Sequence, residues 1–143
     1  IIEQFPDRRC HCDDITEPVA KVLMIDEEKL IPSLMEGLSK QSISSRFDFV
    51  RSTSQYYEIV PKGASKGNAM LKLAEILGLD ASKTISIGDN DNDVSMLKAA
   101  KLGFAVSNAS HNAKTCADYI TVSNNEHAIA KVIDDLDNKK IEI

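Results

Sequence analysis

The sequence of 143 residues contains no tryptophan, and aromatic residues make up only 5% of it. No apolar run approaches the roughly 18 residues that a membrane-spanning helix needs, and the first residues lack the charged and apolar regions of a secretion signal. Lysine and arginine number 17 against 22 acidic residues, for a formal charge of −5. These absences argue against a membrane protein and against a grip on nucleic-acid phosphates, and they predict a soluble, cytoplasmic protein.

Cysteine is scarce as well, with only Cys10, Cys12 and Cys116. An odd count in a chain of this size argues against a disulfide framework. Cys10 and Cys12 flank His11 directly, whereas structural zinc sites separate their ligands by two to four residues, so a zinc site is not expected. With 43% hydrophobic residues, the chain can bury one modest core. The first residue is Ile1 rather than methionine, which is consistent with a piece of a longer protein.

The first 60 residues predict a small α+β layer. An apolar run over 19–25 predicts a buried strand, and Asp26 after it is expected to cap a helix over 27–40. Two further runs, 47–52 and 56–60, flank a polar turn and predict paired antiparallel strands. The predicted order is therefore strand, helix, strand, strand.

The pattern changes after residues 61–63, which mark the predicted boundary between a first domain over 1–60 and a second over 61–143. Strands and helices then alternate, joined by short loops, which predicts right-handed crossovers and a parallel sheet. The first predicted helix begins after Ser65 and is closed by Gly78. The other predicted helices cover 91–101, 109–117 and 126–135, and the strands cover 84–87, 104–106 and 119–121. We expect Leu73 and Leu77 on the apolar face of the first helix and Ile129, Val132 and Ile133 to point inward from the last.

An acid-rich turn follows the first strand of the second part, in the sequence Gly88-Asp89-Asn90-Asp91-Asn92-Asp93. It falls at the carboxyl end of a parallel sheet, where open α/β folds bind ligands. Carboxylate and amide oxygens suit Mg²⁺, which needs only one or two protein carboxylates when phosphate and water complete its shell. The plainer interpretation is a helix cap with solvated acids. An EF-hand does not fit, because Val94 and Ala100 stand where glycine and glutamate are required, and no Walker-type phosphate loop is present.

Four blocks of the sequence together resemble the haloacid dehalogenase (HAD) superfamily, and within it the Cof-type phosphatases with a type IIB α/β cap. The blocks are Pro61-Lys62-Gly63-Ala64-Ser65-Lys66-Gly67, the acid-rich turn after Ile87, Ala105-Val106-Ser107-Asn108-Ala109 and Ala117-Asp118-Tyr119-Ile120-Thr121. The resemblance implies the carboxyl-terminal part of a Rossmann-like parallel-sheet core, preceded by part of the cap. It also implies a Mg²⁺-dependent phosphatase that acts on a small phosphorylated metabolite.

The resemblance assigns roles to particular residues. Lys66 would steady the substrate phosphate and the nucleophile, and Asp89 would hold Mg²⁺. Asn92 would contact the phosphate, and Asp93 would fix the lysine or a metal-bound water. Lysine and a cation converging on one phosphate are also what phosphoryl transfer requires on physical grounds.

One departure from the family pattern changes the expectation for this chain. The family's nucleophile is the first aspartate of a D-x-D-x-T motif, and no such motif occurs here. We therefore expect the chain to be the carboxyl-terminal portion of a longer phosphatase that works through an aspartyl-phosphate, and to be inactive alone. The strand that carries the motif would lie beside 84–87, so its absence predicts an open sheet edge prone to self-association.

Two alternatives stay open from the sequence alone. The chain could be a non-catalytic fragment that binds Mg²⁺ or phosphate weakly, or that associates with another chain. Phosphoryl transfer of the phosphomannomutase kind is a weaker competitor within the same superfamily. His111 and His127 are interpreted as surface residues rather than catalysts, and Cys116 as a small buried residue.

Overall fold

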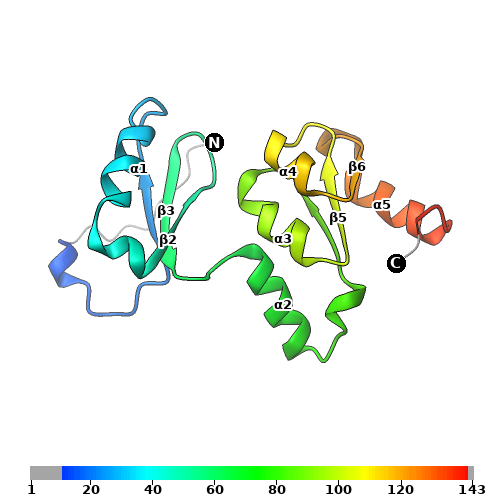
Figure 1. Cartoon of the computed structure of the whole chain (residues 1–143), viewed down its shortest axis with the longest axis horizontal. Helices are drawn as coiled ribbons and strands as arrows, with labels where there is room; N and C mark the ends of the chain where they lie inside the picture. Colours follow the sequence, from blue (N-terminus) through cyan, green and yellow to red (C-terminus); the bar gives the residue numbers. More distant parts are fainter. Residues whose placement is uncertain (1–10, 142–143) are drawn as a thin grey trace.

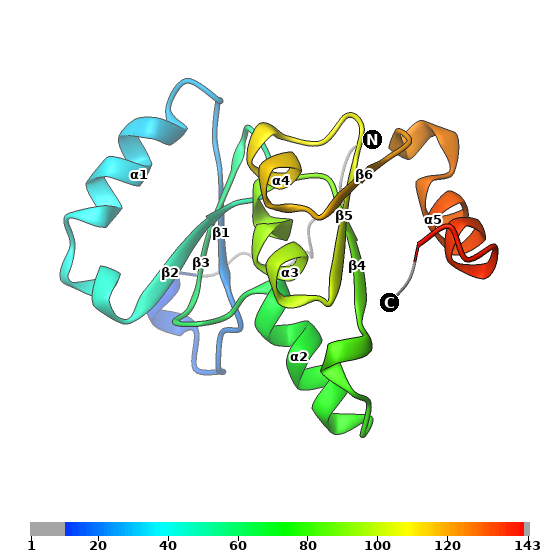
Figure 2. The ribbon, with the colours of Figure 1, turned by 45° about the vertical axis from the view of Figure 1, so that its right-hand side comes forward.

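The structure, a computed structural model, describes residues 11–141, which form two three-stranded sheets that follow one another along the chain (Figure 1). The first sheet contains β1 (Val22–Ile25), β2 (Phe47–Arg51) and β3 (Tyr56–Pro61), in the order β1-β3-β2 with antiparallel pairing. Helix α1 (Ile31–Ser39) covers the side of this sheet that faces away from the second sheet (Figure 2). The predicted strand, helix, strand, strand order is confirmed.

Alternation along the strands separates the two faces of the first sheet. On one face the rings of Phe49 and Tyr57 stack with centroids 5.9 Å apart, and Ile31 at the start of α1 is fully buried. The register pairs Val50 with Glu58, so these two side chains share the opposite face. That opposite face is the one turned toward the second sheet.

The start of α1 differs from the prediction. The helix begins at Ile31 rather than at residue 27, and Asp26 does not cap it. The Asp26 carboxylate instead accepts a hydrogen bond of 2.7 Å from the backbone N–H of Glu27, in the turn before the helix. Pro32 explains the late start, because a proline ring is compatible with the first turn of a helix but not with its interior.

The second sheet contains β4 (Ile85–Gly88), β5 (Leu102–Val106) and β6 (Tyr119–Thr121), paired in parallel and in chain order. The prediction of a parallel sheet is confirmed. Figure 2 shows α3 (Val94–Ala99) and α4 (His111–Cys116) on one side of the sheet and α5 (Ala128–Asp137) on the other. Helix α2 (Lys66–Ile76) packs against α3. The buried core comprises Leu97, Ala105, Val106, Ala109, Ala113 and Ala128.

Helix α3 ends at Ala99, earlier than predicted, and Gly103 belongs to β5 instead of stopping the helix. A Cβ atom at Gly103 would lie 2.5 Å from the carbonyl oxygen of Leu97. The glycine is therefore needed for the close approach of β5 to α3 rather than for a helix end.

Several apolar side chains that were predicted to point inward are exposed. In α5, Val132 is buried as expected, but Ile129 is 64% exposed and Ile133 is 51% exposed. Leu73 and Leu77, on the predicted apolar face of α2, are also exposed. The exposure of Ile129 and Ile133 in α5 follows from the second sheet. Within residues 11–141, β4 pairs with β5 alone, and its other edge has no neighbouring strand. Periodicity shows which side chains share a face, but not whether another layer covers that face.

No helix within residues 11–141 combines the length and the apolar character needed to cross a bilayer. The predicted domain boundary at 61–63 falls between the two sheets and stays a prediction. Cys10 lies outside the described residues, so the expectation that Cys10 and Cys12 do not form a zinc site also stays a prediction. Cys116 is half-buried at the end of α4.

Candidate active site

The acid-rich turn folds around the carboxylate of Asp93. β4 ends at Gly88, and a short 3-10 helix over Asp91–Asp93 follows, with Asn90 at its N-cap. Oδ2 of Asp93 accepts hydrogen bonds from the backbone N–H groups of Asp89, at 2.9 Å, and Asn90, at 3.1 Å. A Cβ atom at residue 88 would lie 2.6 Å from the Cβ of Asp93, so only glycine permits this tight fold.

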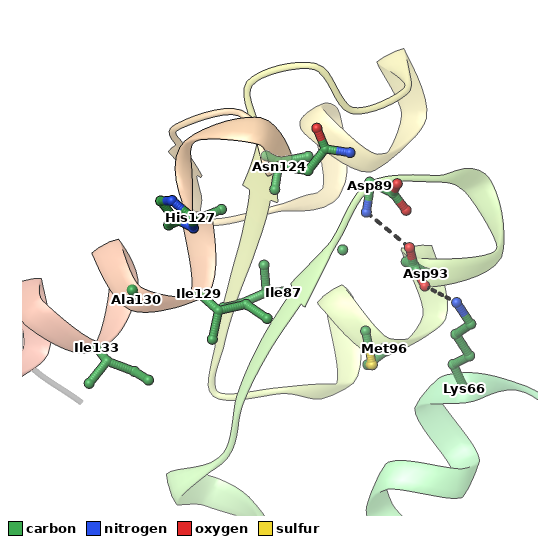
Figure 3. Close-up of a pocket in the computed structure, with 13 residues that line it drawn as sticks. Lys66, Ile87, Asp89, Asp93, Met96, Asn124, His127, Ile129, Ala130 and Ile133 are labelled. Atoms are coloured by element: carbon green, nitrogen blue, oxygen red, sulfur yellow. Dashed lines mark hydrogen bonds and ion pairs between the residues drawn. The ribbon is translucent and has the colours of Figure 1, made fainter.

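Lys66 reaches the same carboxylate from the first turn of α2. Ser65 caps the helix by accepting a hydrogen bond of 3.2 Å from the N–H of Asn68, and this makes Lys66 the first helical residue. The ammonium group of Lys66 donates a hydrogen bond to Oδ1 of Asp93 (Figure 3). The Asp93 side chain is 5% exposed, whereas that of Lys66 is 49% exposed, so one face of the lysine remains open.

Close packing of α2 on α3 places Lys66 where it can make this contact. A Cβ atom at Gly67 would lie 2.3 Å from the carbonyl oxygen of Ser95, and the N–H of Gly67 donates to Oγ of Ser95 at 3.1 Å. The absence of a side chain at Gly67 therefore brings the two helices together.

The pKa values of the two neighbouring carboxyl groups, Asp89 and Asp93, are shifted in opposite directions. Burial alone would raise the pKa of Asp93, but hydrogen bonds from Lys66 and from the N–H groups of Asp89 and Asn90 outweigh it and lower that pKa. Burial raises the pKa of Asp89, and the adjacent Asp93 raises it further, against a smaller lowering by Lys66. Asp93 thus carries the charge that balances Lys66, while Asp89 lacks a counter-charge of its own.

A cavity of about 830 Å³ opens beside these groups and runs along β4 on the side of the free edge. Lys66, Asp89 and Asp93 lie at one end of it (Figure 3). Ile87, Met96, Ile129 and Ile133 contribute apolar walls, and Asn124 and His127 come from the segment between β6 and α5. The exposed isoleucines of α5 therefore face the space beside β4. His127 was predicted to be a surface residue, and it is exposed. It also lines this cavity.

Asn92 lies apart from this cavity. It lines a second cleft of about 770 Å³, between the first sheet and the helices α2 and α3, and Lys66 lines both spaces. The Oδ1 atom of Asn92 is buried and accepts no hydrogen bond within the described part of the chain. A buried acceptor without a hydrogen bond costs free energy. Groups left unsatisfied in this way are typical of functional positions. The structure thus brings Lys66, Asp89 and Asp93 together, with Asn92 on the other side of Lys66.

The carboxylates of the acid-rich turn decide whether the site suits Mg²⁺. No group of three or more histidine, cysteine, aspartate or glutamate side chains suitable for a metal occurs within residues 11–141. Asp91 is already engaged, because its carboxylate accepts hydrogen bonds from Ser110, at 2.6 Å, and Asn112, at 3.2 Å. Asp93 is engaged as well, by Lys66 and by the N–H groups of Asp89 and Asn90. Asp89 remains, and one carboxylate is enough for a Mg²⁺ ion that takes its other ligands from phosphate and water. Asp89 would hold the ion, which would supply charge neutralisation at the phosphate.

Comparisons with known proteins agree with this geometry. Residues 8–133 match the haloacid dehalogenase-like hydrolase family, so the chain belongs to that family. It is 36% identical over 118 residues to a Bacillus subtilis protein named "Putative phosphatase YxeH", covering 82% of this chain and 43% of the relative. A crystal structure of a haloacid dehalogenase-like hydrolase from Bacteroides thetaiotaomicron matches with a TM-score of 0.72 and 35% identity, over 87% of this chain and 46% of that one.

A further solved structure, titled as the HAD subclass IIB sugar phosphatase BT4131, has a TM-score of 0.69 and 23% identity, over 84% of this chain and 44% of that one. At that identity the likeness concerns the fold alone. The predicted membership of this superfamily is confirmed, and the fold agrees with that of a subclass IIB protein. The chain spans less than half the length of the relative and of both solved structures.

Sequence reasoning missed two residues that shape the site, Ser95 and Glu58, and one contact of Asn90, which it had considered only as a helix cap. Ser95 anchors the start of α2, and Asn90 donates a hydrogen bond of 3.0 Å to the carbonyl oxygen of Ser52, which links the acid-rich turn to the first sheet. Glu58 lines the second cleft opposite Asn92. A carboxylate inside the otherwise apolar strand 56–60 was the available signal for Glu58. His111, by contrast, is an exposed residue at the start of α4, as predicted.

Proposed function

We propose that this chain forms the metal- and phosphate-binding part of a Mg²⁺-dependent phosphomonoester hydrolase that works through an aspartyl-phosphate. In this proposal Lys66 binds the substrate phosphate, Asp89 holds the ion, Asn92 contacts the phosphate, and Asp93 fixes the lysine. The observation that carries the proposal is the meeting of Lys66, Asp89 and Asp93 at the carboxyl end of β4, beside a cavity. A cation and an ammonium group at one phosphate neutralise its charge as transfer proceeds.

The nucleophilic aspartate belongs, in this proposal, to sequence outside the 143 residues. The chain has no D-x-D-x-T motif, and the free edge of β4 together with the adjacent cavity provides space for one more strand ending next to Lys66. A parallel strand there would place its carboxyl end at the same edge of the sheet as Asp89. The exposed Ile129 and Ile133 would then be covered.

Phosphate release from an aryl phosphate tests this proposal. The chain preceded by its natural upstream sequence is expected to release phosphate with Mg²⁺ and to stop in EDTA, whereas the 143-residue chain alone releases none above background. In the longer protein, Lys66→Ala and Asp89→Asn are expected to lower kcat/KM at least about a hundredfold, as losses of charge stabilisation do.

Lys72→Ala is the matched control for Lys66→Ala, because Lys72 is also an α2 lysine in an ion pair, with Glu75, but is exposed and lines neither cavity. Its activity should stay within about twofold of wild type. Turnover by the 143-residue chain alone would place the nucleophile within it and contradict the proposal.

A further inference from the structure

The acid-rich turn is joined to the segment after β5 by contacts that the proposed reaction does not use. Ser110, which lies between β5 and α4, donates two hydrogen bonds to this turn. Its backbone N–H donates to the carbonyl oxygen of Asp89 at 2.8 Å, and its hydroxyl donates to Oδ1 of Asp91 at 2.6 Å. One serine therefore links the residue that is proposed to hold Mg²⁺ with an aspartate that binds neither the ion nor the phosphate.

Both main-chain groups of Asp89 are fixed by hydrogen bonds. Its N–H donates to Oδ2 of Asp93 at 2.9 Å, and its carbonyl oxygen accepts from the N–H of Ser110. These two bonds hold the planar peptide groups on either side of its Cα atom. They therefore set the direction in which the Asp89 side chain leaves the backbone at the end of the first cavity (Figure 3). Asp93 supplies one of the two bonds and Ser110 the other.

The carboxylate of Asp91 holds Ser110 in this position. Its distance of 2.6 Å from the serine hydroxyl is that of a hydrogen bond to an ionised carboxylate, which is stronger than one between neutral groups. Its other oxygen, Oδ2, accepts from Nδ2 of Asn112 at 3.2 Å. Ser110 also caps α4, because its hydroxyl oxygen accepts from the N–H of Ala113 at 3.2 Å. Asp91 thus joins the acid-rich turn to the start of α4.

We propose that Asp91 is a positioning residue: through Ser110 it fixes the backbone of Asp89, and with it the carboxylate that binds Mg²⁺. This assignment rests on the proposed function. Groups that orient a metal ligand without touching the metal contribute about ten- to a hundredfold to metal affinity. Because Asp91 acts through hydrogen bonds, the role requires acceptor atoms at residue 91 and not a negative charge.

Calorimetry on the longer protein tests this role with two ligands, Mg²⁺ alone and, in EDTA, inorganic phosphate. Asp91→Ala is expected to weaken Mg²⁺ binding about tenfold, at the lower end of the effect of such orienting groups. Phosphate binding should stay within about twofold of wild type, because Asp93 holds Lys66 through separate hydrogen bonds. A general loss of structure would weaken both ligands.

Two further variants separate hydrogen bonding from charge. Asp91→Asn removes the charge but can still accept from Ser110, and the amide of Asn112 can turn to present its oxygen to the new NH₂ group. Its Mg²⁺ affinity should stay within about threefold of wild type, since it loses only the charge assistance. Ser110→Ala removes the other half of the same hydrogen bond, so it should act like Asp91→Ala and serves if that variant does not fold. The double variant should bind Mg²⁺ no more weakly than the weaker of the two single variants.

Asp80→Ala is the matched control. Asp80 is also an exposed aspartate that accepts from a serine hydroxyl, that of Ser82 at 2.7 Å, and it caps the 3-10 helix Ala81–Lys83 before β4. It lines neither cavity. Asp80→Ala and Asp91→Ala should lower the melting temperature by similar amounts, but only Asp91→Ala should weaken Mg²⁺ binding. The assignment is wrong if Asp91→Ala binds Mg²⁺ as tightly as wild type, if Asp91→Asn loses as much affinity as Asp91→Ala, or if Asp80→Ala loses it equally.

Asp89→Asn separates this inference from the proposed function. Mg²⁺ binding that is lost in Asp89→Asn but unchanged in Asp91→Ala would keep Asp89 as the metal ligand and refute the role of Asp91. Equal Mg²⁺ binding by wild type and Asp89→Asn would refute the proposed place of the ion, and the role of Asp91 with it.

Discussion

At the scale of single residues, Asp93 both shapes the acid-rich turn and balances the charge of Lys66. Its carboxylate accepts two backbone hydrogen bonds that shape the acid-rich turn and a third from Lys66, while its side chain is almost fully buried. A buried charge is tolerated only with such partners. One residue therefore fixes both the turn and the direction of the lysine.

Asp93→Asn is expected to lower the free energy of unfolding by about 2 kcal/mol at neutral pH, a value that allows for the half-exposed Lys66. The folded-state pKa of Asp93 lies below its ordinary value of 3.8, so its stabilising effect is complete above pH 3.8 and is lost as the pH falls through the folded-state pKa. Urea denaturation at neutral pH and near pH 3 should show a difference between variant and wild type that shrinks at the lower pH.

Asp137→Asn provides the comparison, because Asp137 is an exposed carboxylate at the end of α5. Its effect should stay within about 0.5 kcal/mol at both pH values. A loss for Asp93→Asn that is equally large near pH 3 would show that the carboxylate charge is not what stabilises the turn.

At the scale of secondary-structure elements, the contact between α2 and α3 depends on a missing side chain. Gly67→Ala places a Cβ against the backbone of Ser95, which cannot move away without shifting α3. We expect a loss of about 2 kcal/mol in unfolding free energy, in the range of overpacked cores. Thermal or urea denaturation would measure it.

Gly37→Ala is the paired substitution, since Gly37 lies within α1 and a Cβ there has no heavy atom within 4 Å. It should raise stability by about 0.5–1 kcal/mol, because alanine favours helix over glycine. Equal effects at both glycines would mean that the close approach at Gly67 does not hold the two helices together.

The elements themselves were largely predictable, and their ends less so. Short apolar runs bounded by turn residues marked β2, β3 and β4 within about one residue, and Ser65 marked the start of α2. The late start of α1 and the early end of α3 were not predicted. The first depends on the ring of Pro32 and the second on the packing of Gly103 against Leu97. Hydrophobic periodicity contains no information about such local steric contacts.

At the scale of the whole molecule, the edge of β4 that pairs with no strand within residues 11–141 and the exposed isoleucines of α5 make one apolar region. The 143-residue chain is therefore expected to self-associate as its concentration rises, and sedimentation velocity would detect this. Replacing both Ile129 and Ile133 with lysine should shift the protein toward monomer.

Val19→Lys is the control for that pair, because Val19 is 53% exposed but lies before β1, in the part of the chain that forms the first sheet. It should leave the association unchanged. A monomeric wild-type chain at high concentration would contradict this prediction.

The site was predictable only in part. Motif spacing and family resemblance pointed to Lys66, Asp89, Asn92 and Asp93, because these residues lie within two short stretches of sequence. The structure brings Lys66, Asp89 and Asp93 to one cavity, whereas Asn92 lines the second cleft. The second cleft could not be predicted, since Lys21, Ser52, Glu58 and Asn90 meet only after the first sheet has formed and packed near the acid-rich turn. Interactions between residues so far apart carry no local signal.

The strand order of the second sheet also bears on how the chain acquires its shape. β4, β5 and β6 lie side by side in the order in which they occur, so each strand meets its neighbour after a short helical connection. Pairings between segments close in sequence involve little loop-closure entropy and form early. If the proposed further strand pairs with β4 and comes from sequence distant from it, that pairing is expected to form later than the pairings among β4, β5 and β6.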